Sequence, residues 1–231
     1  MSPGSIRIEF VCDVICPWSV VSLEALQKAV ETARATADAN VALHLRPLIL
    51  NRHLLPRSAS SVPVMASRNR LSGSYVGRNY LRQRGLEAGF SFNFFDHICN
   101  TLDAHRLLCW AAQRDAAQPW NLLRALQRAH FTDGDNIASA PVLLRHVEAV
   151  GLDLRPATAI LLSDEFVAEV NTEDRRMRDL GIRSTPSIIF NDRQVISGTR
   201  SVEQYLLALR RPRSQTEPPD LTGDDQRACA S

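Results

Sequence analysis

Lysine is almost absent from this sequence of 231 residues: of 27 basic residues, only Lys28 is a lysine. The 25 acidic residues nearly balance the basic ones and leave a formal net charge of +2. Arginines alternate with acids, as in NTEDRRMRDLG, which is typical of a solvated helix face. The sequence therefore offers no basic surface of the kind that binds nucleic acid or an anionic membrane.

Long hydrophobic runs are also missing. No stretch approaches the roughly 20 apolar residues that a membrane-spanning helix needs. The first residues, MSPGSIRIEFVCDV, lack the basic region followed by an apolar region that marks a signal peptide. We therefore expect a cytoplasmic protein with no membrane partner. Because 45% of the residues are hydrophobic, the chain can build one sizeable core with a smaller inserted lobe.

Cysteines are few and widely spaced, and they are Cys12, Cys16, Cys99, Cys109 and Cys229. An odd, scattered set does not indicate a disulfide framework. His105 and Cys109 lie four residues apart on a predicted helix and can share a face. The closely spaced ligand pairs of a zinc site are missing, so we expect no metal site.

The N-terminal quarter predicts a strand, a helix and a second strand. Residues 6–12 (IRIEFVC) alternate in polarity, which is typical of a strand. Pro17 suits the first position of a helix, and apolar residues then recur every three or four positions as far as Ala33. Residues 41–50 alternate again. This order predicts a right-handed unit with two parallel strands.

The rest of the chain is mainly helical until its last quarter. The middle segment predicts helices over 100–116, 120–131 and 140–150, the first of them capped by Asn100 or Thr101 and ended by Pro119. A further helix over 166–181 precedes two short strands, 187–190 and 194–197, in a hairpin. Ser201 and Gln204 form a capping-box pattern at the start of the last helix.

This order of elements predicts an α/β protein with a thioredoxin-like fold and an inserted all-α-helical domain. The thioredoxin-like domain is expected to be discontinuous, comprising residues 5–55 and 166–211. Residues 56–165 form the predicted inserted domain. The tail, 212–231, is rich in Pro, Asp, Thr and Ser and is predicted to be disordered.

Cys16 is the candidate nucleophile. If Pro17 is the first helical residue, Cys16 is the N-cap, and its sulfur lies near free N–H groups and the positive end of the helix dipole. Such settings lower a thiol pKa by about one to five units, so we expect a reactive thiolate. The alternative is that Cys16 is a buried apolar residue.

Ser19 occupies the position of the second cysteine in a Cys-x-x-Cys motif. Its hydroxyl is expected to hydrogen-bond the Cys16 thiolate, but it cannot form a disulfide. A single thiolate stops at the mixed disulfide, so an external thiol such as glutathione must complete the cycle. Alternatively, Cys16 polarises a bound thiol cofactor or adds reversibly to an electrophilic substrate.

The other cysteines are poor candidates to resolve a mixed disulfide at Cys16. Four extended residues separate Cys12 from it by roughly 13 Å, whereas a disulfide needs Cα atoms within about 7 Å. Cys99 or Cys109 can approach only if the helical segment folds over the site.

Thr185 and Pro186 form the candidate substrate contact. A proline at the first position of a strand is a candidate for a cis peptide bond. A cis bond here would leave the backbone groups of Thr185 free to pair with an extended peptide or with glutathione. The alternative is an ordinary trans proline.

Five segments of the sequence resemble the FrnE-like branch of the DsbA family. They are DVICPWS, LRPLILN, NTLDAHRLLCWAAQRD, HFTDGDNIAS and LGIRSTPSIIFNDRQVISGTRSVEQYLLAL, and the resemblance covers nearly the whole chain apart from the tail. The resemblance implies a thioredoxin fold with an inserted helical domain and a cytoplasmic dithiol-disulfide oxidoreductase. The branch is related to 2-hydroxychromene-2-carboxylate isomerases and kappa-class glutathione transferases, which use glutathione.

The resemblance also assigns roles to single residues. Cys16 matches the nucleophilic cysteine, Pro186 the cis-proline, and Thr185 the residue whose backbone meets the substrate. Ser19 departs from the resolving cysteine, which puts a dithiol mechanism in doubt. In the isomerase and transferase relatives, serine usually occupies the positions of both Cys16 and Ser19.

Further binding residues follow from the same resemblance. Pro17 and Trp18 are expected to contact substrate, as are Asn100 and His105 in the segment that lines the cleft of relatives. For His105, the alternative is a core or surface histidine. The loop before the last helix implies that Thr199, Arg200 and Ser201 hold the γ-glutamyl end of glutathione, with the helix N-terminus receiving a carboxylate.

The sequence therefore predicts a monothiol thiol-disulfide oxidoreductase acting on a thiol or disulfide substrate, either a protein or a small molecule. No cofactor is expected to be tightly bound, and glutathione is the expected co-substrate. Because relatives are commonly dimers, a homodimer is a further expectation. The alternative enzyme is a glutathione-dependent isomerase or transferase of an aromatic electrophile. A third alternative is a redox-inactive chaperone or binding module.

Overall fold

A computed structural model describes residues 5–37, 40–55, 59–60, 75–93 and 98–210, and the predicted tail lies outside the described residues. The elements in chain order are β1 (Ile6–Cys12), α1 (Pro17–Ala37), β2 (Val41–Pro47), β3 (Ala59–Ser60), α3 (Tyr75–Glu87), β4 (Ile98–Cys99), α4 (Leu102–Ala112), α5 (Gln118–Arg128), the π-helical turn η2 (Ala129–Asp133), α6 (Ala140–Ala149), α7 (Leu154–Leu162), α8 (Val167–Asp179), β5 (Ser187–Phe190), β6 (Gln194–Ser197) and α9 (Val202–Arg210).

A mixed four-stranded sheet forms the centre of the molecule, with the strand order β2-β1-β5-β6. β1 and β2 are parallel over their full length, which confirms the predicted strand–helix–strand unit. β5 runs antiparallel to β1, and β6 antiparallel to β5. The prediction of a thioredoxin-like α/β fold is therefore confirmed.

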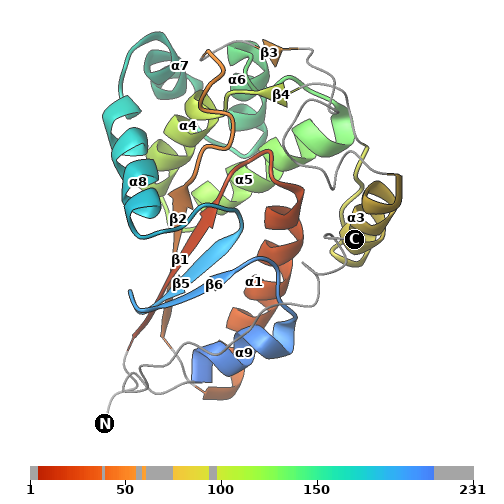
Figure 1. Ribbon diagram of the computed structural model, residues 1–231. Helices are drawn as coiled ribbons and strands as arrows, with labels where there is room; N and C mark the ends of the chain where they lie inside the picture. The colour runs from red at the N-terminus through yellow and green to blue at the C-terminus, as the bar shows by residue number, and fades with distance from the viewer. Residues whose placement is uncertain (1–4, 38–39, 56–58, 61–74, 94–97, 211–231) are drawn as a thin grey trace.

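The alternation of β1 separates two cores. Ile8, Phe10 and Cys12 point into the large core with α1 and α9, which lie side by side in Figure 1. Val11 points to the other face, where a smaller core contains Met177 of α8. Successive side chains of β1 therefore point to opposite faces of the sheet, and helices cover both of these faces.

Helices α4, α5, α6 and α7 lie beyond the end of β1, whereas α3 packs on α1 and α8 on β2. In Figure 1, β1 points toward α4, α5, α6 and α7, so the loop that follows β1 faces this helical segment. α4 packs on α5, α7 and α8, and α8 packs on β2. The predicted boundaries of two domains, at residues 55 and 166, stay a prediction.

Several element boundaries differ from the sequence prediction. α4 ends at Ala112, before Pro119, because Asp115 accepts a hydrogen bond from the N–H of Ala117 (2.7 Å) and turns the chain into α5. Pro119 instead lies in the first turn of α5. β2 ends at Pro47, three residues earlier than predicted.

Four elements were missed. α7 begins at an Asp153 cap, whose carboxylate accepts the N–H of Arg155 (2.8 Å), a signal that the sequence does contain. α3 is strongly polar and has little amphipathic character. The two-residue strands β3 and β4 pair with each other although they lie about forty positions apart in sequence. No local sequence pattern predicts such a pair.

Glu9 is the charged residue on which the α8 face of the sheet depends. It lies on β1 and is 1% exposed. Its carboxylate accepts hydrogen bonds from Arg7, Arg46 and Arg176 at 2.7–3.0 Å. Burial raises its pKa, but these arginines outweigh burial and lower the pKa from 4.5 to about 2.

This network predicts a loss of stability in acid. Because the pKa of Glu9 is lower in the folded state, its contribution is complete above pH 4.5 and disappears as the pH falls through about 2. Glu9 should account for a loss of roughly 2 kcal/mol between pH 7 and pH 3. Urea unfolding at several pH values should show that the free energy of unfolding falls more steeply with decreasing pH in wild type than in Glu9→Gln. Parallel curves would contradict this assignment.

Candidate active site

Cys16 lies immediately before α1, in the loop that follows β1, as the sequence predicts. The Thr185–Pro186 peptide bond is cis, which confirms the prediction of a cis-proline at this position. The Cys16 thiol donates a hydrogen bond to the carbonyl oxygen of Thr185, 3.3 Å away. The two residues are 169 positions apart in sequence, so the fold creates this pair by placing β5 next to β1.

The backbone of Thr185 is thus only partly free. We expected both of its polar groups to be open for a substrate, but its carbonyl accepts the Cys16 thiol hydrogen in this structure. A substrate strand that pairs with this carbonyl would share or compete for the oxygen that the thiol uses.

Ser19 stands one turn into α1 and is fully buried. Its hydroxyl oxygen makes no well-formed hydrogen bond. It nevertheless lies close enough to Cys16 to lower the thiol pKa, as the backbone N–H of Ser19 also does. The Ser19 hydroxyl can therefore donate a hydrogen bond to an ionised Cys16 sulfur or to the sulfur of a bound thiol.

The prediction of an acidic Cys16 thiol is wrong for this state of the protein. Cys16 is only 5% exposed, and burial raises its pKa above the ordinary value of 9.0. Ser19 and Thr185 act in the opposite direction, and the negative charge of Asp13 raises the pKa further. Burial outweighs the donors at the helix N-terminus, because a thiolate loses more by leaving water than these groups return.

Asp13 is the site residue that sequence reasoning missed. It is fully buried, and one carboxylate oxygen accepts the N–H of Leu50 at 2.7 Å. The other oxygen lies 3.3 Å from Nε2 of His105. Its backbone carbonyl accepts the N–H of Cys16 at 3.1 Å. The signal was an acidic residue inside the apolar run FVCDVIC, where a charge needs a specific partner.

Asn100 lies just before α4, and His105 lies in its first turn. The two side chains have different roles. The Asn100 amide donates to the carbonyl of Leu54 (2.7 Å), and its oxygen accepts the N–H of Leu102 (2.8 Å). Both ends of Asn100 are therefore used in holding α4. His105 is 1% exposed and points at Asp13, so it agrees with the alternative of a core histidine as well as with a role in the site.

The remaining predicted contacts lie around the first turn of α1. Pro17 is buried, and the half-buried Trp18 ring packs against Tyr80 of α3 with centroids 5.8 Å apart. The hydroxyl of Thr199 donates to the carbonyl of Trp18 (3.3 Å), which brings the loop before α9 to the site.

The loop residues expected to hold glutathione also have structural roles. The buried Arg200 donates to the carbonyl of Thr199 (2.9 Å). Ser201 accepts the N–H of Gln204 (3.3 Å), and Gln204 accepts the N–H of Ser201 (3.0 Å), so the predicted capping box is confirmed. Their contact with glutathione stays a prediction.

The four described cysteines are all free. Cys12 and Cys99 are fully buried, and burial raises the pKa of Cys99 to about 12 and that of Cys12 well above 9.0. Cys109 is partly exposed, and burial raises its pKa to about 11. Within the described residues, no group of three or more His, Cys, Asp or Glu side chains could hold a metal ion.

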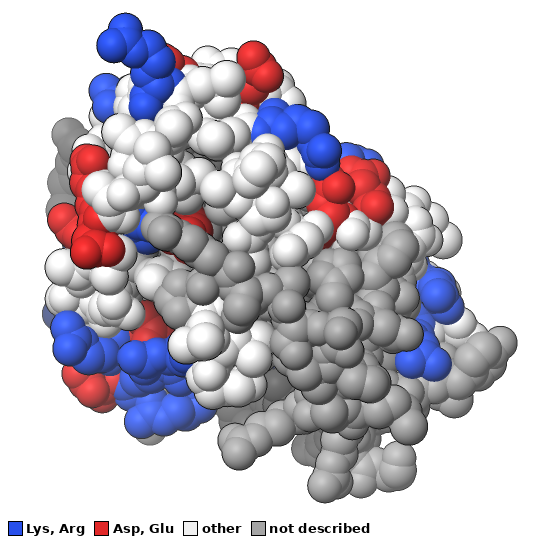
Figure 2. Space-filling view, turned by 90° about the horizontal axis from the view of Figure 1, so that it is seen from above, with Lys and Arg blue, Asp and Glu red and all other residues white. Residues whose placement is uncertain are grey.

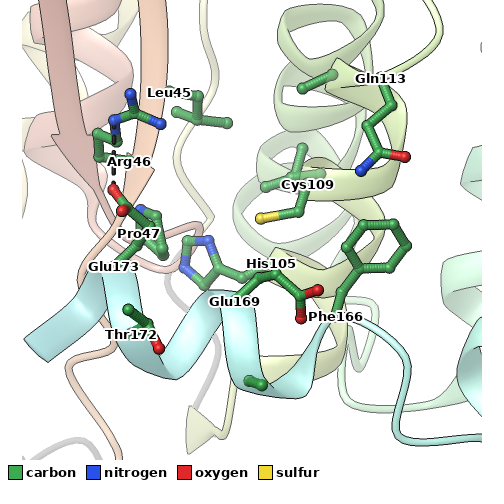
Figure 3. A pocket seen from close by; sticks show the side chains of 13 residues that line it. Leu45, Arg46, Pro47, His105, Cys109, Gln113, Phe166, Glu169, Thr172 and Glu173 are labelled. Carbon is green, nitrogen blue, oxygen red and sulfur yellow. Dashed lines mark ion pairs between the residues drawn. The ribbon is translucent and has the colours of Figure 1, made fainter.

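A pocket of about 570 Å³ opens on the other side of His105. Its walls come from the end of β2, from one face of α4 and from the first turns of α8, and Figure 3 shows His105 and Cys109 on α4 facing α8 across it.

Seen from the helical end, the described surface carries acidic and basic side chains in neighbouring positions rather than a patch of one sign (Figure 2).

A family model described as a DSBA-like thioredoxin domain matches residues 7–210. The chain belongs to the family of DSBA-like thioredoxin domains. Among curated proteins, no sequence matches this chain. No helix in the described residues is long and apolar enough to cross a membrane.

Solved structures with the same fold include a probable DsbA oxidoreductase from Streptomyces coelicolor, with 23% identity, a TM-score of 0.78, and coverage of 95% of this chain and 97% of that one. The cytosolic disulfide reductase DsbM from Pseudomonas aeruginosa with GSH has 18% identity and a TM-score of 0.58, covering 88% and 96%. A 2-hydroxychromene-2-carboxylate isomerase has 13% identity and a TM-score of 0.61, covering 88% and 92%. At these identities the likeness shows the DSBA-like fold.

The electrostatics of the site predict an alkaline profile for Cys16. Its alkylation rate, followed by mass spectrometry of the Cys16 peptide, should rise with pH to a midpoint above 9.0. Asp13→Asn keeps an oxygen for the N–H of Leu50 and removes one negative charge, so its midpoint should be lower than that of wild type. A wild-type midpoint near 7, or an unchanged midpoint in Asp13→Asn, would contradict this electrostatic account.

Proposed function

We propose that this DSBA-like protein is a monothiol thiol-disulfide oxidoreductase. The observation that carries the proposal is the Cys16 thiol, 3.3 Å from the Thr185 carbonyl beside a cis proline, with Ser19 in place of a second sulfur. Family membership supports the general activity. The monothiol mechanism is the part that is new to this chain.

The first step is attack of the Cys16 thiolate on one sulfur of a substrate disulfide. The S–S bond of the substrate breaks, a Cys16–substrate disulfide forms, and the second substrate sulfur leaves as a thiolate that takes up a proton. The substrate lies along Thr185 as an added strand, displacing the thiol from that carbonyl. No atom of Ser19 can attack the mixed disulfide.

An external thiol completes the cycle. The thiolate of a molecule such as glutathione attacks the mixed disulfide, so that Cys16 leaves as a thiolate and the substrate departs joined to glutathione. Cys12 and Cys99 are poor alternatives, since both are fully buried with raised pKa values. The related fold of DsbM, solved with GSH and described as cytosolic, supports glutathione and a cytoplasmic location. The homodimer stays a prediction.

Restoring the second sulfur tests the monothiol mechanism. Ser19→Cys should reduce insulin disulfides with dithiothreitol as electron donor at least ten times faster than wild type, because the new thiol resolves the mixed disulfide internally. The control Ser19→Ala should not gain activity, and Cys16→Ser/Ser19→Cys should be inactive. An unchanged rate in a folded Ser19→Cys protein, checked by circular dichroism, would count against the mechanism.

A second function is favoured by the raised Cys16 pKa. A protonated Cys16 and the unpaired Ser19 hydroxyl are two neutral donors that could polarise the sulfur of bound glutathione. This would suit a glutathione-dependent isomerase or transferase of an aromatic electrophile, and the fold of 2-hydroxychromene-2-carboxylate isomerase is similar. In this alternative Cys16 makes no covalent bond.

Glutathione binding and exchange separate the two functions. The oxidoreductase should form a Cys16–glutathione disulfide with oxidised glutathione, detectable as a mass increase of the Cys16 peptide. The isomerase should bind reduced glutathione at micromolar concentrations, measured by calorimetry, and should keep that affinity in Cys16→Ser because serine is also a donor. Failure to bind reduced glutathione would exclude the isomerase.

A further inference from the structure

The pocket behind His105 is separate from the thiol site. Cys16, Ser19, Thr185 and Pro186 are not among its lining residues, and His105 is the side chain that it shares with the Asp13 network. Its volume of about 570 Å³ is within the range of roughly 300–1,000 Å³ that small-molecule sites have. The pocket is therefore large enough for an organic ligand that need not react with Cys16.

Apolar side chains make up much of the wall. Leu45 contributes from β2, Leu108 and Ala112 from α4, and Phe166 from the residue before α8. Phe166 is held with its backbone in the left-handed region (φ 64°), a conformation that a bulky residue rarely adopts. In Figure 3 its ring stands at one end of the pocket, next to the carboxylate of Glu169. A ligand with an apolar body would find contact on several sides.

The charges in the wall are unevenly matched. Arg46 pairs with Glu9 (2.7 Å) and Glu173 (3.5 Å), and Glu173 also pairs with Arg176 (3.1 Å). Glu169 makes no ion pair or side-chain hydrogen bond with any residue that the structure describes. The remaining unmatched charge is therefore a carboxylate.

Cys109 carries no charge that could neutralise Glu169 or add to it. Its thiol lies in the same wall, and burial raises its pKa to about 11, so it is protonated at neutral pH. The carboxylates of Glu173 and Glu169 raise the same pKa, while Arg46 lowers it. Glu169 itself lines the pocket from an exposed position on α8, where the ammonium group of a bound cation could pair with it.

We propose that this pocket binds a small organic monocation, a primary amine with an aromatic or aliphatic body. Its ammonium group pairs with Glu169, beside the ring of Phe166 that also lines the pocket. Its body packs against Leu45 and Leu108. A metal ion is a poor occupant, since the described residues offer no group of three suitable donors.

Calorimetry on the full-length Cys16→Ser protein tests the proposal without thiol chemistry. The probes are 2-phenylethylamine, the uncharged 2-phenylethanol and the anionic 3-phenylpropanoate, which share a ring and differ in charge. The amine should bind at least ten times more tightly than the alcohol, and the carboxylate should not bind detectably. No binding of the amine, or equal binding of amine and alcohol, would overturn the proposal.

Three variants locate the binding site. Glu169→Gln should weaken binding of the amine about ten-fold, whereas the matched change Glu148→Gln, at an exposed position on α6, should leave it unchanged. Ala112→Trp fills the pocket from an exposed position on α4 and should abolish binding while the protein stays folded by circular dichroism. Full affinity in Ala112→Trp would overturn the site. These results do not depend on whether Cys16 exchanges disulfides.

Discussion

The buried residue Asp13 holds together three segments of the candidate active site, two through its carboxylate and one through its backbone carbonyl. It receives the N–H of Leu50 after β2 and contacts His105 of α4, while its own carbonyl fixes the N–H of Cys16. The same negative charge raises the pKa of the Cys16 thiol. The residue that assembles the site therefore opposes ionisation of its sulfur.

The state of Cys16 follows from a contest between burial and local donors. A position before a helix favours thiolate, and Ser19 adds its hydroxyl and N–H in the same direction. Removal of the sulfur from water is the larger effect, and the thiol hydrogen is bound to Thr185 instead. A substrate that takes the Thr185 carbonyl removes this partner of the thiol. In the proposed oxidoreductase, occupation of the cis-proline site would therefore also change the hydrogen bonding of the Cys16 thiol.

The sequence predicted what depends on local pattern. The limits of β1, the start of α1 at Pro17, the hairpin of β5 and β6 and the cap at Ser201 follow from periodicity and capping residues within a few positions. The cis bond at Pro186 was one of two alternatives. The burial of Cys16 and the contact of His105 with Asp13 were out of reach, because they depend on how α4 docks over the end of β1, 92 residues away in sequence for that contact.

The absence of a second sulfur constrains function more than the presence of the first. Cys12 and Cys99 are fully buried and their thiol pKa values are raised, so neither can readily serve as the second sulfur of the site. Ser19 keeps a polar donor beside Cys16 and gives up the capacity to close a disulfide. In either proposed function, Cys16 must work with the sulfur of a second molecule. In both cases the activity depends on residues that orient this second sulfur toward Cys16, and the carbonyl of Thr185, 3.3 Å from the Cys16 sulfur, is placed to contribute to that orientation.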